Sequence, residues 1–262
     1  MGMAVLLLSL GVSAAIRAQP ATWLGINTNI VFSVKVGFSQ GWAFDGTFGY
    51  DFQGRYIGKY NSDWEQLDRN NYPFSGLTNY AGLANYNHLG AGTCYAGRLY
   101  VAMEDWHGCG SVTNQSIGVF STVDLRRISV TVVSNYQNEI SAVTVAPDLG
   151  TNGIVFAASF CDGTHLFEYA LPDLNHVRDL KLSQNIHLIQ GIGYYNRLIY
   201  VDADSGTNAL IYAISPETGE VRYLASLTVP KATEYEGLDV SQGDFRIAEG
   251  GTERLFFYHF SK

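Results

Sequence analysis

Positively charged side chains are few in this sequence, and they form no cluster. The chain carries 16 Lys and Arg against 24 Asp and Glu, which gives a formal net charge of −8. Nucleic acids and anionic membranes are recognised through patches of Lys and Arg. We therefore exclude a nucleic-acid partner and a protein that binds anionic membranes.

Cysteine is also scarce, with Cys94, Cys109 and Cys161 as its three positions. The sequence has no CxxC pair and no Cys/His spacing typical of zinc sites. Cys109 and Cys161 both fall in Gly-rich turns, HGCG and FCDG, so a disulfide between them is one option in an exported chain. Cys94 lies in an apolar segment and is predicted to be a buried small hydrophobe.

Long hydrophobic runs are absent after the N-terminus, so no later segment could span a bilayer. The run Ala4–Val12 is followed by small residues. This pattern predicts a secretory signal over residues 1–18, with cleavage near Ala15 or Ala18, and a secreted or periplasmic protein. An uncleaved anchor is the alternative, although the run is shorter than the roughly 20 residues of a membrane span.

Several catalytic motifs are missing from the sequence. There is no GxSxG nucleophile elbow, no P-loop and no HExxH zinc motif. The stretch Asp202–Gly206, DADSG, resembles a calcium loop but lacks the terminal bidentate Glu. We interpret it as a turn.

Glycine and aromatic residues are abundant instead: 28 Gly, 14 Phe, 17 Tyr and 4 Trp. This composition favours many short strands joined by tight turns. A unit of about 50 residues with up to four strands recurs, which is typical of β-propeller blades. The repeat predicts one all-β domain over residues 19–262, a five-bladed β-propeller. The alternative is an evenly spaced β-sandwich. The predicted blades start near residues 38, 87, 138, 188 and 234.

Two departures from the repeat refine this prediction. The last copy has only three strands, and Ile30–Val36 is a strand without a blade, so residues 30–36 are predicted to complete the last blade and close the ring. Residues 61–86 form an insertion between the first and second copies. Part of it must supply the outer strand of blade one, and the rest is predicted to be a polar and aromatic loop on one face.

Polar residues open the first strand of each blade, and these strands line the central channel of a propeller. We predict a channel-mouth site from these residues, which could bind calcium or zinc or hold an acid/base pair. A water-filled, hydrogen-bonded channel is the alternative. The five residues are Gln40, His88, Glu139, Gln190 and Glu236.

A second group of acidic residues follows the second strands, and most are predicted to lie in turns. Trp106 and His107, in an expanded turn of blade two, could contact a ligand, with a solvated turn as the alternative, and Tyr235 is also expected to contact a ligand. The acidic residues are Asp51, Glu104, Asp105, Asp202, Asp204 and Glu249.

The stretch FSQG, from Phe38 to Gly41, together with the five-blade count, resembles the plant-type glutaminyl cyclase family. The resemblance implies conversion of N-terminal glutamine to pyroglutamate, with a channel-mouth glutamate moving protons. It covers Phe38 and Gln40. The pair Asn138-Glu139 is similar to the family's Asn-Glu pair but falls in the third blade, where the family has it in the next one. His88-Leu89-Gly90 stands where the family has Glu-Gly. Looser similarity extends to olfactomedin, NHL-like and lactonase propellers.

Two functions follow from these observations. The first is an exported propeller that binds a small molecule, a carbohydrate or a peptide at the channel mouth and the loop of residues 61–86, with a protein partner as a further option. The second is an enzyme of glutaminyl cyclase or of lactonase or hydrolase type. In the enzyme, Glu236 or Glu139 would be the general base and His88 the proton shuttle, while Gln40 and Gln190 would orient the substrate.

Overall fold

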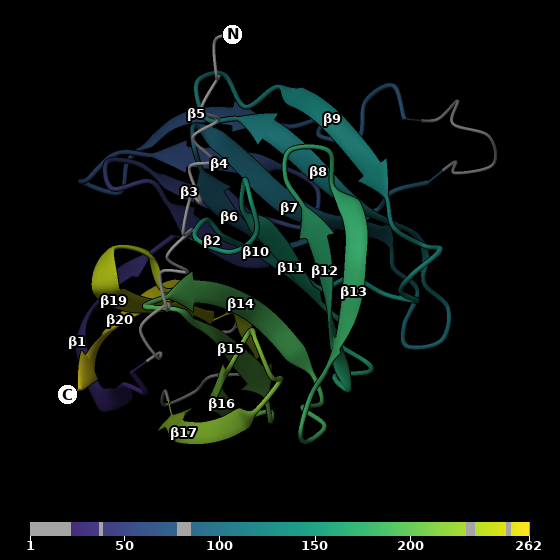
Figure 1. Cartoon of the computed structure of the whole chain (residues 1–262). Helices are drawn as coiled ribbons and strands as arrows, with labels where there is room; N and C mark the ends of the chain where they lie inside the picture. The colour runs from purple at the N-terminus through teal and green to yellow at the C-terminus, as the bar shows by residue number, and fades with distance from the viewer. Residues whose placement is uncertain (1–21, 37–38, 78–84, 229–233, 250–252, 262) are drawn as a thin grey trace, which may run out of the picture.

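The computed structural model describes residues 22–36, 39–77, 85–228, 234–249 and 253–261. Within these ranges the chain forms twenty β-strands in four sheets and one short 3-10 helix, η1 (Ser241–Gly243) (Figure 1). The predicted all-β class is confirmed. The predicted signal segment, Phe38 and residues 78–84 of the inserted loop lie outside the described residues. Within the described part of the chain, no helix is long and apolar enough to span a membrane.

Two of the sheets are simple antiparallel meanders of four strands each. The first has the order β2-β3-β4-β5 and the other the order β14-β15-β16-β17. The strands of the first are β2 (Gly41–Phe44), β3 (Gly49–Phe52), β4 (Ile57–Tyr60) and β5 (Gln66–Asn70). Those of the other are β14 (Ile189–Tyr195), β15 (Leu198–Asp204), β16 (Asn208–Ile214) and β17 (Val221–Thr228).

The eight-stranded sheet consists of two further meanders, β6 to β9 and β10 to β13. Their first strands pair in parallel at Ala91 and Ala142, which joins the two meanders into one sheet. The first meander is β6 (His88–Tyr95), β7 (Arg98–Asp105), β8 (Thr113–Ser121) and β9 (Arg127–Val132). The second is β10 (Ala142–Ala146), β11 (Ile154–Ala158), β12 (His165–Ala170) and β13 (Asn175–Lys181).

The last sheet is a fifth meander, β18 to β20, completed by the strand β1 from the N-terminal part of the chain. Its order is β1-β20-β19-β18, and β1 pairs antiparallel with β20 (Figure 1). The N-terminal strand begins at Gly25, five residues before the start that the sequence predicted at Ile30. The strands are β1 (Gly25–Lys35), β18 (Tyr235–Asp239), β19 (Asp244–Glu249) and β20 (Arg254–Ser261).

In each meander the first strand is the more buried one, and the strand at the opposite end is the more exposed one. We call these the buried edge strand and the exposed edge strand of the meander. All five residues of β10 and of β18 are buried, whereas most of β5 is exposed. The buried edge strands approach one another so closely that a Cβ on Gly41 would lie 2.6 Å from the Ala91 Cα. Gly237 has a φ of 78° and faces the backbone of Gly41 just as tightly, so neither position tolerates a side chain.

Apolar clusters fill the spaces between consecutive meanders. Phe52 packs with Leu99 between the first and second, and Val119 packs with Tyr169 between the second and third. A further cluster joins Trp42 of β2 to residues of the last sheet, including Phe257. Burial of these faces supplies the main stabilising free energy of the fold.

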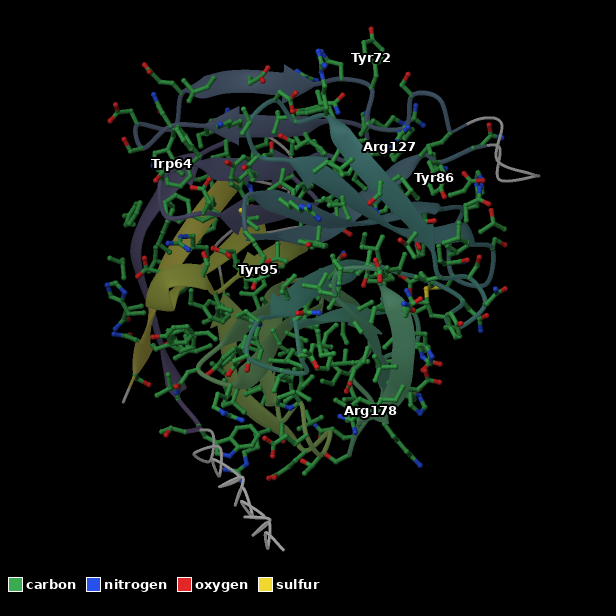
Figure 2. The ribbon with its side chains drawn as sticks, turned by 45° about the horizontal axis from the view of Figure 1, so that its top comes forward. Trp64, Tyr72, Tyr86, Tyr95, Arg127 and Arg178 are labelled. Atoms are coloured by element: carbon green, nitrogen blue, oxygen red, sulfur yellow. A yellow bond between two sulfur atoms is a disulfide. The ribbon has the colours of Figure 1, made fainter. Side chains whose placement is uncertain are left out.

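The inserted segment of residues 61–86 contains β5, which forms the exposed edge of the first sheet. Trp64, just before β5, stacks edge-on against Phe257 of β20 at 5.4 Å between ring centroids. Figure 2 shows Trp64 on the side of the molecule where β1 and the C-terminal strands lie. This part of the insertion therefore packs on the fold.

Candidate functional site

A cavity of about 200 Å³ lies where the buried edge strands begin. Its walls come from all five meanders, so residues far apart in the sequence share one small space. The lining residues are Gln40, His88, Glu104, Trp106, Glu139, Ser141, Phe160, Gln190, Glu234 and Glu236.

All five residues predicted at the channel mouth line this cavity, and Trp106 joins them. Each of the five lies within three residues of the start of a buried edge strand. His88 is the first residue of β6, and Glu236 is the second residue of β18. The repeat brings them together because it puts equivalent positions at one end of the sheets.

Tyr235 and His107, predicted as ligand contacts, do not line the cavity. Tyr235 is completely buried in an apolar cluster that includes Tyr200 and Tyr258, because neighbouring residues of a strand point to opposite faces and Glu236 takes the inward position. The His107 side chain is 62% exposed, and its Nε2 lies 3.2 Å from Asp105 Oδ1. Neither residue therefore contributes to this cavity, and a ligand contact by either one stays a prediction.

The sequence interpretation did not expect Glu104, Glu234, Ser141 or Phe160 at the channel mouth, and it placed Glu104 in the acidic group after the second strands. Glu104 lies opposite His88 in the register of β6 and β7, so it reaches the same cavity from the neighbouring strand. Extending β7 by one residue beyond its last apolar residue, Met103, would have identified it. Glu234 directly precedes β18 and accepts a hydrogen bond from Gln190 Nε2 at 3.3 Å.

The acidic residues assigned to turns also need a correction. Asp51, Glu104, Asp202 and Glu249 lie inside the second strands of their meanders and are almost completely buried. Burial raises the pKa of Asp51 and of Asp202 to about 8 in each case. These side chains are therefore buried acids of the fold and not solvated turn residues.

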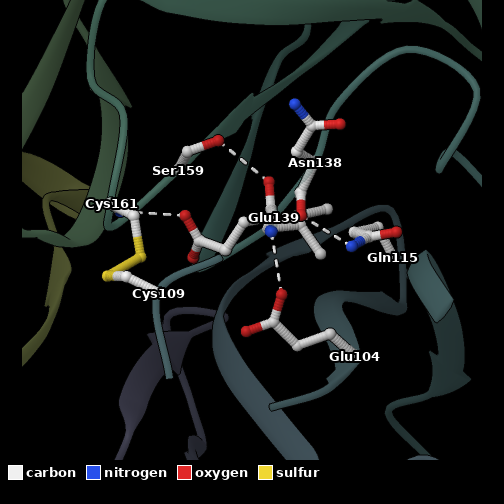
Figure 3. Close-up of a disulfide and its surroundings, with 8 residues drawn as sticks. Glu104, Cys109, Gln115, Asn138, Glu139, Ser159 and Cys161 are labelled. Carbon is white, nitrogen blue, oxygen red and sulfur yellow. Dashed lines mark hydrogen bonds between the residues drawn. A yellow bond between two sulfur atoms is a disulfide. The ribbon is translucent and has the colours of Figure 1, made fainter. Parts of the chain in front are cut away.

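Glu139 is held by the backbone of the loop that carries the disulfide (Figure 3). The Cys161 N–H donates to Glu139 Oε2 at 3.0 Å, and the Ser159 hydroxyl donates to the Glu139 main-chain oxygen at 2.9 Å. Cys161 is bonded to Cys109, as the turn pattern suggested, and Cys94 is a free, half-buried cysteine. The other carboxylate oxygen of Glu139, Oε1, is buried and has no hydrogen-bond partner among the described residues.

This environment shifts the proton affinity of Glu139 toward neutral pH. The side chain is 5% exposed, and burial raises the pKa of Glu139 to about 7. The N–H groups of Cys161 and Phe160 oppose the shift because they favour the charged form, while the nearby Asp162 charge adds to it. A pKa near 7 allows a carboxyl group both to accept and to return a proton under physiological conditions.

Burial also raises the pKa of two further acids of the cavity, Glu104 and Glu236. Burial and then the charge of Glu139 raise the pKa of Glu104 to about 9, although the Ile140 N–H donates to its Oε2 at 2.9 Å (Figure 3). Burial and then the charge of Glu234 raise the pKa of Glu236 well above its usual range. With a pKa of about 9, Glu104 is a hydrogen-bond donor at pH 7.

One further wall of the cavity is aromatic and consists of His88, Trp106 and Phe160. Burial lowers the pKa of His88 to about 4, so its imidazole is neutral. Trp106 lies between His88 at 6.3 Å and Phe160 at 5.8 Å, measured between ring centroids. The Asn87 side chain bonds both the N–H and the carbonyl of Trp106, which fixes this wall.

The donor set does not fit the calcium or zinc site that was considered from the sequence. In the ranges that the structure describes, no three His, Cys, Asp or Glu side chains are arranged so that they could hold one metal ion. We derive no step through a metal.

Comparison with known proteins identifies the fold alone. Neither a protein-family model nor a curated protein matches the sequence. The structure is similar to the crystal structure of the glutaminyl cyclase of Myxococcus xanthus, with a TM-score of 0.64 and 17% identity over 89% of this chain and 96% of that chain. A chain in a mitotic checkpoint complex matches over 100% of both chains with a TM-score of 0.49 and 9% identity, too weak a likeness to argue from. The chain thus shares an all-β, propeller-like fold with a glutaminyl cyclase.

Proposed function

We propose that this protein is an enzyme of glutaminyl cyclase type, which releases ammonia from an N-terminal glutamine and leaves pyroglutamate. The observation that carries the proposal is Glu139. It is a buried carboxyl group with one fixed oxygen, one unpartnered oxygen and a pKa of about 7, in a cavity of about 200 Å³. This combination is typical of a group that transfers protons during catalysis.

Cyclisation needs such a group because a proton must leave one nitrogen and reach another. The neutral α-amino nitrogen attacks the γ-carboxamide carbon, and a carbon–nitrogen bond forms. The Glu139 carboxylate accepts a proton from the attacking nitrogen and delivers it to the amide nitrogen. The original carbon–nitrogen bond then breaks, ammonia leaves, and Glu139 is again ionised.

The other residues of the cavity have roles that follow from their protonation states. Glu104 is a neutral acid and donates a hydrogen bond to the oxyanion of the tetrahedral intermediate. At the start of the second meander, the family pattern has a Glu where this chain has His88. Glu104 lies on the neighbouring strand, directly opposite His88, and so supplies a carboxyl group near that position. A neutral imidazole with a pKa near 4 is a weak base, so we assign His88 to the wall and not to proton transfer. Gln40 and Gln190 are placed to orient the substrate amide.

We further infer that the five meanders form a five-bladed propeller, closed by β1 as the outer strand of the last blade. The order β1-β20-β19-β18 and the apolar cluster of Trp42 with Phe257 support this ring. We also infer that residues 19–262 form this propeller as a single domain. The disulfide between Cys109 and Cys161 supports an exported protein, because disulfides persist in oxidising compartments.

The test is ammonia release from a C-terminally blocked glutaminyl dipeptide. We expect turnover by the wild type and a loss of roughly 10²- to 10⁴-fold in Glu139→Gln, the usual contribution of a general acid/base. Glu217→Gln is the matched control, because Glu217 is an exposed surface carboxylate. Turnover that is equal in wild type and Glu139→Gln would refute the assignment. A folded wild type without turnover would favour the alternative, a propeller that only binds its ligand.

A further inference from the structure

A second, larger cavity opens beside the candidate site. It measures about 740 Å³, within the range of roughly 300–1,000 Å³ that small-molecule sites occupy. We call it the side groove and define it by Asn114, Gln115, Tyr136, Gln137, Thr164 and His165. It lies between β8 and β12, and Glu139 lines both the side groove and the channel-mouth cavity.

The lining of the side groove suits a neutral and polar ligand. Amide and hydroxyl side chains predominate, and no Lys or Arg lines it. The acidic residues Asp162 and Glu139 are part of its wall, so phosphates and carboxylates are repelled. Amide side chains present donors and an acceptor side by side, which matches groups that both donate and accept.

The side groove contains a buried amide, Gln137, whose polar atoms are unpaired within the described part of the chain. Its side chain is 2% exposed, yet neither its amide nitrogen nor its amide oxygen has a hydrogen-bond partner among the described residues. Leaving a buried polar group unpaired costs about 1–3 kcal/mol. Such a group calls for an explanation, and a bound ligand would satisfy both atoms.

Tyr136 provides a fixed aromatic surface next to Gln137. It is 49% exposed, and its ring stacks on His176 at 4.0 Å with an interplanar angle of 10°. His176 is in turn bonded to Asp179 at 2.8 Å, which holds the stack in place. An exposed and immobilised aromatic ring beside the unpaired amide of Gln137 matches a ligand with one apolar C–H face and a polar edge.

The strand pairing disfavours a peptide in this groove. Peptides commonly bind to a sheet by adding a strand to a free edge. Here β8 pairs with both β7 and β9, and β12 pairs with both β11 and β13, so neither strand bordering the groove offers a free edge. Recognition must therefore come from side chains.

We propose that the side groove binds a neutral oligosaccharide. The hydroxyl groups of the sugar pair with the amides of Gln137 and Asn114, and one sugar ring packs on Tyr136. The proposal concerns binding and does not depend on the cyclase activity, because it is measured in the absence of any glutaminyl substrate.

Calorimetric titration with maltotetraose, cellotetraose and tetra-N-acetylchitotetraose tests the proposal. We expect at least one of these probes to bind, and Gln137→Leu and Tyr136→Ala each to raise its Kd about tenfold or more. Tyr223→Ala is the matched control, since Tyr223 is a similarly exposed tyrosine on β17. Gln137→Leu should fold normally, because it removes an unpaired amide and keeps the side-chain volume. If it did not fold, Tyr136→Ala would decide alone.

Three results would overturn the proposal. The first is the absence of binding by all three oligosaccharides at millimolar concentration. The second is a Kd that changes no more in Tyr136→Ala than in Tyr223→Ala. The third is binding of a neutral tetrapeptide, such as blocked tetraalanine, that Gln137→Leu abolishes, since this would assign the groove to peptides.

Discussion

The backbone N–H of Cys161 donates a hydrogen bond to Oε2 of Glu139 at 3.0 Å, and Cys161 is the residue that the disulfide joins to Cys109. The cross-link therefore restrains the loop that orients Glu139. It connects the turn after β7 to the loop after β11, so it also ties the second meander to the third. One covalent bond thus acts on both the stability of the fold and the geometry of the site.

The double variant Cys109→Ser, Cys161→Ser is expected to lose stability. The bridge spans 52 residues, and constraining a loop of this size in the unfolded chain stabilises a protein by up to about 4 kcal/mol. Urea unfolding, monitored by tryptophan fluorescence, measures the free energy of unfolding. Reductant should destabilise the wild type and leave the double variant unchanged. Equal stability of the two proteins without reductant would show that the disulfide contributes nothing.

Glu104→Gln should retain most of the cyclase activity, whereas Glu104→Ala should lose it. Glu104 is protonated at neutral pH and acts as a hydrogen-bond donor, and a glutamine amide also donates. The wild-type rate should fall as Glu104 ionises at about pH 9, and this fall should be absent in Glu104→Gln. Steady-state turnover between pH 7 and 10 measures both effects. Equal loss of activity in the two variants would argue that ionised Glu104 is required.

Asp202→Asn is expected to make stability less dependent on pH. Burial raises the folded-state pKa of Asp202 from 3.8 to about 8. Between these values the folded state keeps a proton that the unfolded state has released, so the free energy of unfolding falls as pH rises. Each such group contributes a slope of about 1.4 kcal/mol per pH unit. The asparagine does not titrate and should remove this slope.

Urea unfolding of the wild type and Asp202→Asn at pH 5, 6, 7 and 8 provides the comparison. Asp173→Asn is the control, because Asp173 is an exposed aspartate. Parallel stability curves for wild type and Asp202→Asn would mean that Asp202 is ionised in the folded protein.

The sequence predicted the strand repeat well because each unit carries its own local signals. Small and apolar residues mark a buried edge strand such as Ala142–Ala146, and polar ones mark an exposed edge such as Gln66–Asn70. Equivalent positions then meet at one end of the sheets, which explains why Gln40, His88 and Glu139 were correctly expected to share a cavity.

The rest of the site depends on facts that local patterns do not contain. Glu104 and Asp202 follow apolar residues directly and were assigned to turns, whereas strands β7 and β15 continue through them. Tyr235 and Glu236 are adjacent, and only the register of β18 decides which one points inward. The pKa of Glu139 depends on its burial and on the N–H of Cys161, which is 22 residues away in the sequence.

The pH dependence of kcat/KM for ammonia release from a glutaminyl dipeptide tests the central claim most directly. Ionised Glu139 is the proton acceptor, so the wild-type value should rise with pH through a midpoint of about 7, the pKa of Glu139. In Glu139→Gln, the residual rate should rise only with deprotonation of the substrate α-amino group, at about pH 7.7–8.0, and the component near pH 7 should be absent. A wild-type rate that showed no rise near pH 7, or an identical profile in Glu139→Gln, would contradict the account.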